Sequence, residues 1–192
     1  MESLRPRAAF TVVEAIVGMA VVAVVAAIVV VSTSDTRRAA RVTADIDVLR
    51  ELTASLNKFD TGVTVFPLSL LHLTTRPLST NFDSCGNAFG AANVTNWANS
   101  GPFYSQPISG PIPLEVGTVS TSLVRVGPTL PATTAAAVLQ LSVTGVVVDD
   151  AIEINTQVDN DPLVGSASTT GIVRFPNPFL GTFTWNIAVR GC

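Results

Sequence analysis

The chain contains few of the residues that enzymes and nucleic-acid-binding proteins rely on. Its 192 residues include two cysteines, one histidine and only 13% charged residues, with a formal net charge of −3. No GxSxG, HExxH, phosphate-loop or dinucleotide motif occurs in it. The cysteines and the histidine do not make a typical zinc set, and a basic excess expected for nucleic-acid binding is missing. We therefore expect no catalytic residue and no bound cofactor, and we interpret His72 as structural.

A long apolar run near the N-terminus is the main feature that the sequence does have. Residues 15–31 carry no charge and no strongly polar group, and the run is 22 residues long when counted from Phe10. About 20 helical residues are enough to cross the core of a bilayer. Arg5 and Arg7 precede this run, and one carboxylate, Glu14, lies inside it. The pattern predicts a membrane-spanning helix that starts near Phe10.

The segment Phe10-Thr11-Val12-Val13-Glu14 resembles the start of the mature chain in type IV prepilins and type II secretion pseudopilins. The resemblance implies cleavage between Ala9 and Phe10, methylation of the Phe10 amine, and an assembly role for Glu14. Ala9 stands where this family usually has glycine. A carboxylate at membrane depth is costly and usually faces a partner, which would be the Phe10 amine of a neighbouring subunit. The alternative is that Glu14 lies near the headgroups of an ordinary signal anchor.

For the whole chain, the resemblance implies a structural subunit of a type IV pilus or a type II secretion pseudopilus, and not an enzyme. It would cross the inner membrane once, with its N-terminus in the cytoplasm and its head in the periplasm or in an extracellular filament. Its partners would be other pilin or pseudopilin subunits, the prepilin peptidase, the inner-membrane assembly platform and the lipid bilayer. Major pilins often have proline where this chain has Val31, which favours a minor subunit.

Two other functions remain open at this point. A pilin-like receptor for DNA uptake or adhesion would need a basic cluster on the head, for which Arg125, Arg174 and Arg190 are the candidates. A membrane-anchored enzyme would depend on His72. Nucleic acid is not an expected partner of the subunit that the resemblance implies.

The first helix is expected to continue beyond the membrane. Apolar residues step by three or four positions, as on one buried helical stripe: Val42, Ile46, Leu49, Leu52, Leu56 and Phe59. Gly62 is the predicted terminator in a left-handed conformation, which gives a helix over residues 10–61. Arg41 and Asp45 have the i,i+4 spacing of an ion pair. The stripe is expected to pack on a sheet, and a coiled-coil dimer is the competing interpretation.

Residues 63–113 contain many prolines and polar turn residues, so we expect a loop with one short helix or strand at 68–73. Trp97 followed by Gly101-Pro102-Phe103-Tyr104 resembles the W…GPY pattern of the connecting region in pilin-like proteins. We expect these aromatic side chains to fasten the loop to the core. Asn93-Val94-Thr95 matches the N-x-S/T sequence of a glycosylation site, but the match rests on the sequence alone and we give it little weight.

The C-terminal half shows the period of two that is typical of strands. Residues 139–144 and 183–190 alternate apolar and polar side chains, and 122–126, 145–148 and 171–175 are further strand candidates. A helix followed by antiparallel strands predicts an α+β fold. The predicted organisation is a leader at 1–9, an N-terminal helix at 10–61 that spans the membrane to about 31 and is then amphipathic, and a globular head at 62–192.

The remaining candidates are the cysteines and an acidic tract. In the oxidising compartment that the resemblance implies, Cys85 and Cys192 would form one disulfide. The acidic residues of the tract are possible calcium ligands, but they lack EF-hand spacing: Asp149, Asp150, Glu153, Asp159 and Asp161. Residues 152–174 also resemble a stretch that shapes a C-terminal loop in pilin-like heads. We therefore favour a solvated turn over a calcium site.

Overall fold

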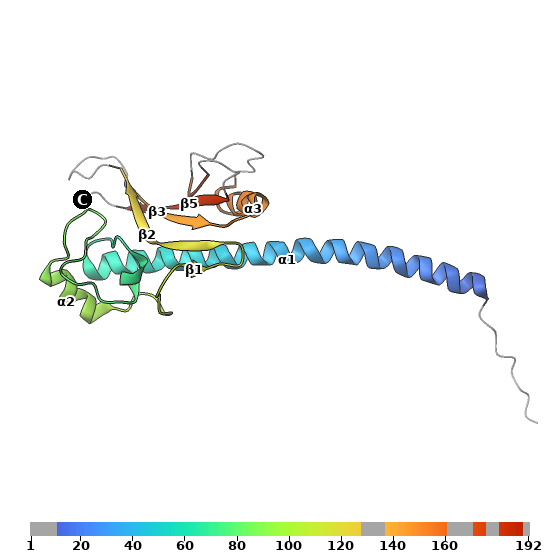
Figure 1. Ribbon diagram of the computed structural model, residues 1–192, viewed down its shortest axis with the longest axis horizontal. Helices are drawn as coiled ribbons and strands as arrows, with labels where there is room; N and C mark the ends of the chain where they lie inside the picture. The colour runs from blue at the N-terminus through green and yellow to red at the C-terminus, as the bar shows by residue number, and fades with distance from the viewer. Residues whose placement is uncertain (1–10, 128–136, 161–170, 176–180, 190–192) are drawn as a thin grey trace, which may run out of the picture. The chain divides into compact units, whose positions relative to one another are not determined.

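The computed structural model describes residues 11–127, 137–160, 171–175 and 181–189, with the side chains of 29–34 excepted. It has the α+β architecture with an antiparallel sheet that the sequence predicts, and the sheet has five strands among the described residues (Figure 1). The chain divides into two compact units, Met1–Ala40 and Arg41–Cys192. Helix α1 (Val12–Val63) contributes residues to both units.

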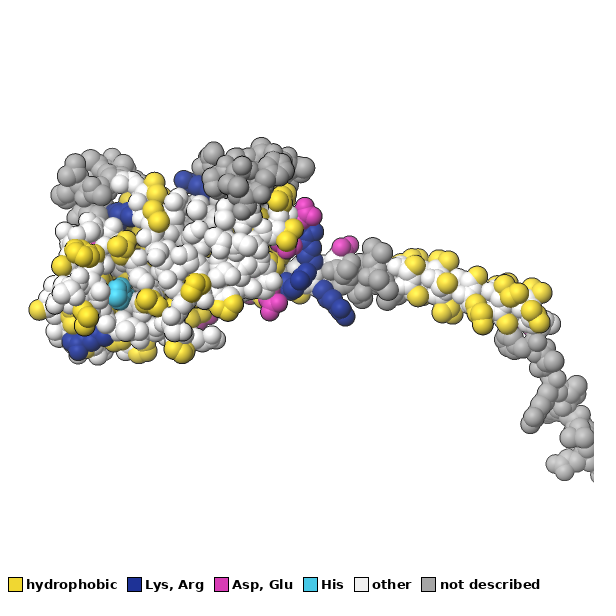
Figure 2. All heavy atoms as spheres, viewed as in Figure 1, with side chains coloured by type: hydrophobic (Ala, Val, Ile, Leu, Met, Phe, Trp, Pro, Cys, Tyr) yellow, Lys and Arg dark blue, Asp and Glu magenta, His cyan; other side chains and the backbone are white. Residues whose placement is uncertain are grey.

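In the first unit, α1 carries apolar side chains that stay exposed all along residues 12–28. The exposed fractions of the large ones lie between 53% for Val25 and 76% for Val12, and Figure 2 shows them following the helix. Across the residues that the structure describes, no helix is both long enough and apolar enough to cross a membrane.

In the second unit, α1 buries the stripe that the sequence predicts. All six residues from Val42 to Phe59 on that stripe are at most 2% exposed. They belong to one hydrophobic core with the inward-facing residues of the sheet. The stripe thus packs on the sheet of its own chain, as expected, because the amphipathic helix finds its apolar partner there.

The end of α1 differs from the prediction. Gly62 lies inside the helix, and Thr64, with φ of 75°, is the left-handed residue that follows Val63. A Cβ atom on Gly62 would lie 2.9 Å from Cε1 of Phe103. This position needs glycine because an aromatic ring packs directly against the helix backbone, and not because the chain turns there.

The sheet has the strand order β1-β2-β3-β5-β4. Its strands are β1 (Ile112–Pro113), β2 (Thr118–Val126), β3 (Ala137–Thr144), β4 (Val173–Arg174) and β5 (Thr182–Val189). The four predicted strand regions 122–126, 139–144, 171–175 and 183–190 therefore contain strands. Residues 145–148 do not, because Gly145 turns the chain with φ of 78° and a helix begins at Val148.

Strands β3 and β5 form the centre of the sheet and face α1. Leu139 pairs with Ile187 and Leu141 with Trp185, and all four side chains are buried. Trp185 also donates its Nε1–H to Oγ1 of Thr53 on α1, at 3.1 Å. The hydrogen bond gives the buried indole the polar partner that it needs.

In the part of the chain that the structure describes, three helical segments lie outside α1, and two of them differ from what the sequence predicts. The 3-10 helix η1 (Leu70–Leu73) falls in the region where a short element was expected. Helix α2 (Ala91–Ser100) lies in what was predicted as loop, and α3 (Val148–Asp159) contains the predicted acidic turn. Helix α2 has no buried residue, so it lacks the apolar stripe that would have revealed it.

Candidate functional site

The start of α1 is held by a reciprocal pair of polar residues. Oε2 of Glu14 accepts hydrogen bonds from the backbone N–H and the hydroxyl of Thr11, both at 2.9 Å. The Thr11 hydroxyl in turn accepts the N–H of Glu14 at 3.2 Å. This is a capping box, in which threonine and the glutamate three residues later satisfy the free donors of a helix start. The sequence contains the T-x-x-E spacing of such a box, and the capping role is an addition to the two roles that the sequence suggests for Glu14.

The capping box leaves the second oxygen of Glu14 available. Both bonds from Thr11 go to Oε2, and Oε1 has no hydrogen-bond partner among the described residues. A positively charged group could therefore reach Oε1 without breaking the cap. Ala9 and Phe10, the predicted processing residues, lie outside the described residues.

The aromatic residues of the connecting region fasten it to the core, as predicted. Trp97 donates its Nε1–H to the carbonyl of His72 at 2.7 Å. The Phe103 ring packs on Phe59 of α1, with ring centroids 5.1 Å apart, and on Trp97 at 6.3 Å. Tyr104, the last residue of the motif, is buried. These contacts give the motif a structural role.

His72 is placed as a packing residue. Its ring lies edge-on against Phe89, with centroids 5.6 Å apart. Burial lowers its pKa, because a charged imidazolium would lose hydration there. The aromatic packing and the lost hydration favour a neutral ring at this position.

The side chain of Asn93 forms hydrogen bonds within the fold that would compete with the attachment of a glycan. Its Oδ1 accepts the N–H of Gly90, and its Nδ2 donates to the carbonyl of Val63 at 2.8 Å. The side chain thus caps α2 and ties it to the end of α1. Both polar atoms of the amide are occupied inside the fold.

The acidic tract forms helix α3, so the prediction of a solvated turn is wrong. Asp149 and Asp150 lie in its first turn, where carboxylates favour the helix dipole. Within the described ranges, no three or more acidic, histidine or cysteine side chains are grouped to hold a metal ion. Oε1 of Glu153 accepts a hydrogen bond from Nε2 of Gln157 at 2.8 Å. Asp161 lies outside the described residues.

Asp159, at the end of α3, binds the backbone that leads into β4. Its two oxygens accept the N–H groups of Ile172 and Val173, at 3.0 and 2.8 Å. Gly171, with φ of +85°, lies so close to this carboxylate that a side chain would collide with it. The resemblance at residues 152–174 implied a shaped C-terminal loop, and Asp159 joins the two described ends of that stretch.

Asp45 was expected to pair with Arg41, and this prediction is wrong. The Asp45 side chain is only 2% exposed. Its oxygens accept the N–H groups of Glu115 and Val116, at 2.8 and 2.9 Å. Burial raises the pKa of this carboxyl, although the two hydrogen bonds act in the opposite direction. Asp45 therefore fastens the segment between β1 and β2 to α1.

The arginines proposed for a receptor surface are not clustered. Arg125 pairs in register with the buried Leu139 and donates its Nη1–H to Ser84 at 3.2 Å. Arg174 lies on β4, with β3 and β5 between it and β2, and it pairs with Thr184 on the face of the sheet opposite to Arg125. Arg190 lies outside the described residues. Arg125 and Arg174 thus do not form together the basic patch that a DNA receptor would need.

Cys85 is not a free thiol. It is half-buried and follows the buried Asp83, whose Oδ1 accepts the Cys85 N–H at 2.8 Å. Cys192 lies outside the described residues, so the pairing of Cys85 with Cys192 stays a prediction.

Two grooves flank the exposed face of α1, and neither was predicted. The first, which we call the α1–β5 groove, has a volume of about 610 Å³ and includes Arg50, Ala54, Asn57, Trp185 and Ala188 in its lining. The second, of about 660 Å³, shares Ala54 and Asn57 with it and is otherwise lined by residues including Lys58, Ser100 and Phe103. Their lining residues come from segments far apart in the sequence, so periodicity within one segment could not reveal them.

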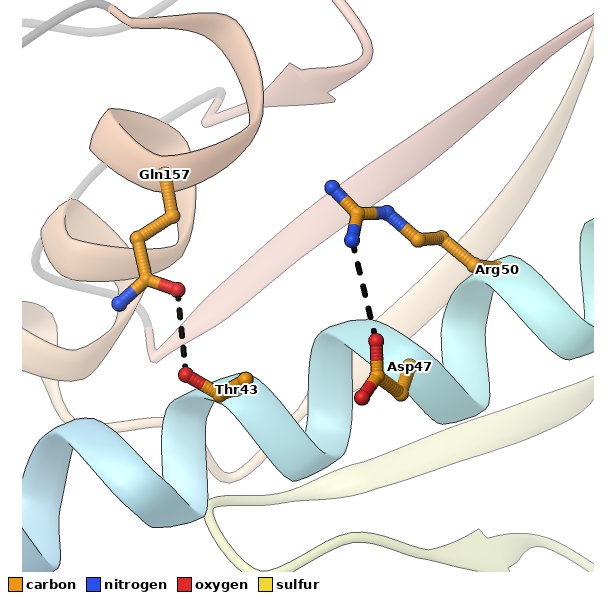
Figure 3. A network of polar contacts seen from close by, with 4 residues as sticks. All are labelled: Thr43, Asp47, Arg50 and Gln157. Atoms are coloured by element: carbon orange, nitrogen blue, oxygen red, sulfur yellow. Dashed lines mark hydrogen bonds and ion pairs between the residues drawn. The ribbon is translucent and has the colours of Figure 1, made fainter.

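Two polar contacts lie along the middle of α1, where Arg50 lines the first groove (Figure 3). Thr43 donates its hydroxyl proton to Oε1 of Gln157 on α3, at 3.4 Å. Nη1 of Arg50 lies 3.7 Å from Oδ1 of Asp47. The side chains of this ion pair are 61% and 69% exposed, so it adds little to stability.

No family model, curated protein or solved structure matches this chain.

Proposed function

We propose that this chain is a pilin-like subunit that is anchored in a membrane by its first helix and assembles through that helix. It would belong to a type IV pilus or a type II secretion pseudopilus, as the FTVVE segment suggests. Its role would be mechanical, with the peptidase, the assembly platform and other subunits as partners. A leader at residues 1–9 would be removed before assembly.

The observation that carries the proposal is the change in character along α1. Residues 12–28 expose apolar side chains, whereas the stripe from Val42 onwards is buried under the sheet of the same chain. Exposed apolar surface of this extent favours removal from water into lipid or between helices. The first part of α1 is thus available for a bilayer or a filament core, and the second part holds the head.

The geometry of Glu14 adds a second line of support. The capping box fixes one carboxylate oxygen on Thr11 and leaves Oε1 without a described partner. The resemblance requires a free Phe10 amine from another subunit near this carboxylate. An amine–carboxylate pair in a medium of low dielectric is much stronger than the same pair in water.

The test replaces Glu14 by leucine in the full-length chain. We expect Glu14→Leu protein to be inserted, folded and disulfide-bonded, because the core of the head is built from residues from Val42 onward. It should enter filaments poorly and recover little of a second, differently tagged copy after cross-linking. Glu51→Leu, at an exposed position later on the same helix, should assemble like the wild type.

Two results would overturn the proposal or part of it. A mature N-terminus at any residue other than a methylated Phe10, measured by mass spectrometry, would remove the pilin assignment. Wild-type assembly of Glu14→Leu would instead remove the amine–carboxylate account and leave the rest standing.

A further inference from the structure

The walls of the α1–β5 groove come from two elements that are far apart in the sequence. Residues of the exposed face of α1 form one wall, and the outer end of β5 forms the other, with Ile172 beside it. Trp185 contributes an apolar surface on the β5 side, and Ala54 contributes a small apolar side chain on the α1 side. Ile172 is 41% exposed. The groove is therefore an apolar channel that is open to solvent.

The end of β5 that extends beyond β4 has no strand beside it on the β4 side among the described residues. Within the described ranges, strand β4 pairs with Trp185 and Thr184 of β5, and the N–H of Asn186 donates to the carbonyl of Ile172 at 2.7 Å. Hydrogen-bonding direction alternates along an antiparallel strand, so the N–H and C=O of Ala188 point to the same side as those of Asn186. Ala188 lies beyond the part of β5 that pairs with β4. Among the described residues, none forms a hydrogen bond with the N–H or the C=O of Ala188 on the β4 side. The backbone at Ala188 can accept another strand.

The charge in the groove has one sign. Arg50 is the only charged side chain among its described lining residues. Figure 3 shows the Arg50 guanidinium beside Asp47, its one ionic contact in the described structure, at 3.7 Å. A guanidinium has five N–H donors, and most of these are left for a ligand. A carboxylate is the group that fits them best.

We propose that the α1–β5 groove binds an extended peptide segment of a partner protein, which adds a strand at Ala188 and places a carboxylate against Arg50. Main-chain bonds to a free edge supply affinity, and alternate side chains supply specificity. Apolar side chains of the peptide would lie against Trp185 and Ile172. A small apolar acid could pair with Arg50 but could not form main-chain hydrogen bonds with the strand edge. The free edge therefore favours a peptide as the ligand. The inference is independent of filament assembly.

The test measures binding of a fluorescein-labelled peptide by fluorescence anisotropy, with the full-length chain in detergent. The peptide alternates valine and threonine and carries one glutamate. A second peptide has the same sequence with methylated backbone nitrogens, so that it keeps the side chains but cannot donate to the edge. We expect the first peptide to bind and the methylated one to lose at least about tenfold in affinity, roughly the loss of one or more hydrogen bonds.

Two pairs of variants locate the site. Arg50→Glu should weaken binding about tenfold, while Lys58→Glu, on the same helix but outside this groove, should change it less than about twofold. Ala188→Pro removes the open N–H, and Ala188→Ser is its control. The methylated peptide keeps the test independent of whether the proline variant folds.

Two outcomes would overturn the inference. The first is an absence of binding up to about 1 mM peptide, the range of the weakest useful affinities. The second is equal binding of the methylated and unmethylated peptides, with displacement by dodecanoic acid. That result would identify an apolar acid as the occupant instead of a peptide strand.

Discussion

Replacing Asp45 by alanine would remove a buried carboxylate that holds two backbone N–H groups. Hydrogen bonds to a charged group are worth about 1.5–3 kcal/mol each. Part of this loss of stability is offset because the variant no longer has to bury a charge. Burial of the charge is also the largest influence on the pKa of Asp45. We therefore expect Asp45→Ala to lower the free energy of unfolding by about 3 kcal/mol. Asp45→Asn keeps one acceptor and should lose about half of this amount.

The pH dependence of this effect has a definite sign. Burial raises the pKa of Asp45 in the folded protein, and the nearby charges of Glu115 and Asp150 raise it further. A carboxyl whose folded pKa lies above its unfolded value stabilises most at pH values below the unfolded pKa. That contribution is lost as the pH rises through the folded pKa. The stability of the wild type relative to Asp45→Asn should therefore decrease as the pH rises from about 4.

The measurement is urea unfolding of the full-length chain in detergent, followed by near-UV circular dichroism at several pH values. Asp47→Ala is the matched control, because Asp47 lies on the same helix but is exposed; it should change the free energy of unfolding by less than about 0.5 kcal/mol. The reasoning would be refuted if Asp45→Ala were as stable as Asp47→Ala. It would also fail if the wild type gained stability relative to Asp45→Asn as the pH rose.

Three further predictions concern the packing of the head. Gly117→Ala should destabilise it by about 1–3 kcal/mol, because the new Cβ would lie 2.8 Å from the carbonyl oxygen of Thr144; Gly110→Ala, with no atom within 4 Å, should not. Asn93→Ala should cost about 1–2 kcal/mol through loss of the α2 cap and of the bond to α1, measured in the same unfolding assay, whereas a cost close to zero would mean that solvent replaces both bonds. A non-reducing peptide map should recover Cys85 linked to Cys192, and free thiols at both would show that the C-terminus is held in another way.

Local periodicity was a good guide wherever one face of an element is apolar. The stripe from Val42 to Phe59 and the alternation in β3 and β5 follow directly from the sequence, since each element must bury its apolar face. The aromatic motif around Trp97 also indicated its own role. The stripe and the strands needed only the spacing of residues within one segment, whereas the aromatic motif was identified by its resemblance to the pattern of pilin-like proteins.

Helices α2 and α3 were harder to predict. Helix α2 buries no residue, so nothing in its spacing separates it from a loop. Helix α3 follows an apolar run at 146–148 that has the appearance of a strand. The buried residues of α3 have the spacing of one helix face, but one of the three is polar: Ala151, Ile154 and Asn155. In both cases contacts with other segments determined the local structure.

The sequence alone determined the α+β class, the buried stripe of α1 and the apolar character of its first part, because these depend on composition and period. Tertiary structure alone decided the roles of several polar residues and of one glycine. Asp45 holds backbone from another element, Asn93 joins two helices, and Gly62 makes room for a distant ring. Likewise, the α1–β5 groove exists only because α1 and β5 lie side by side. Such roles depend on which distant segments meet, and the spacing of residues along one segment carries no information about that.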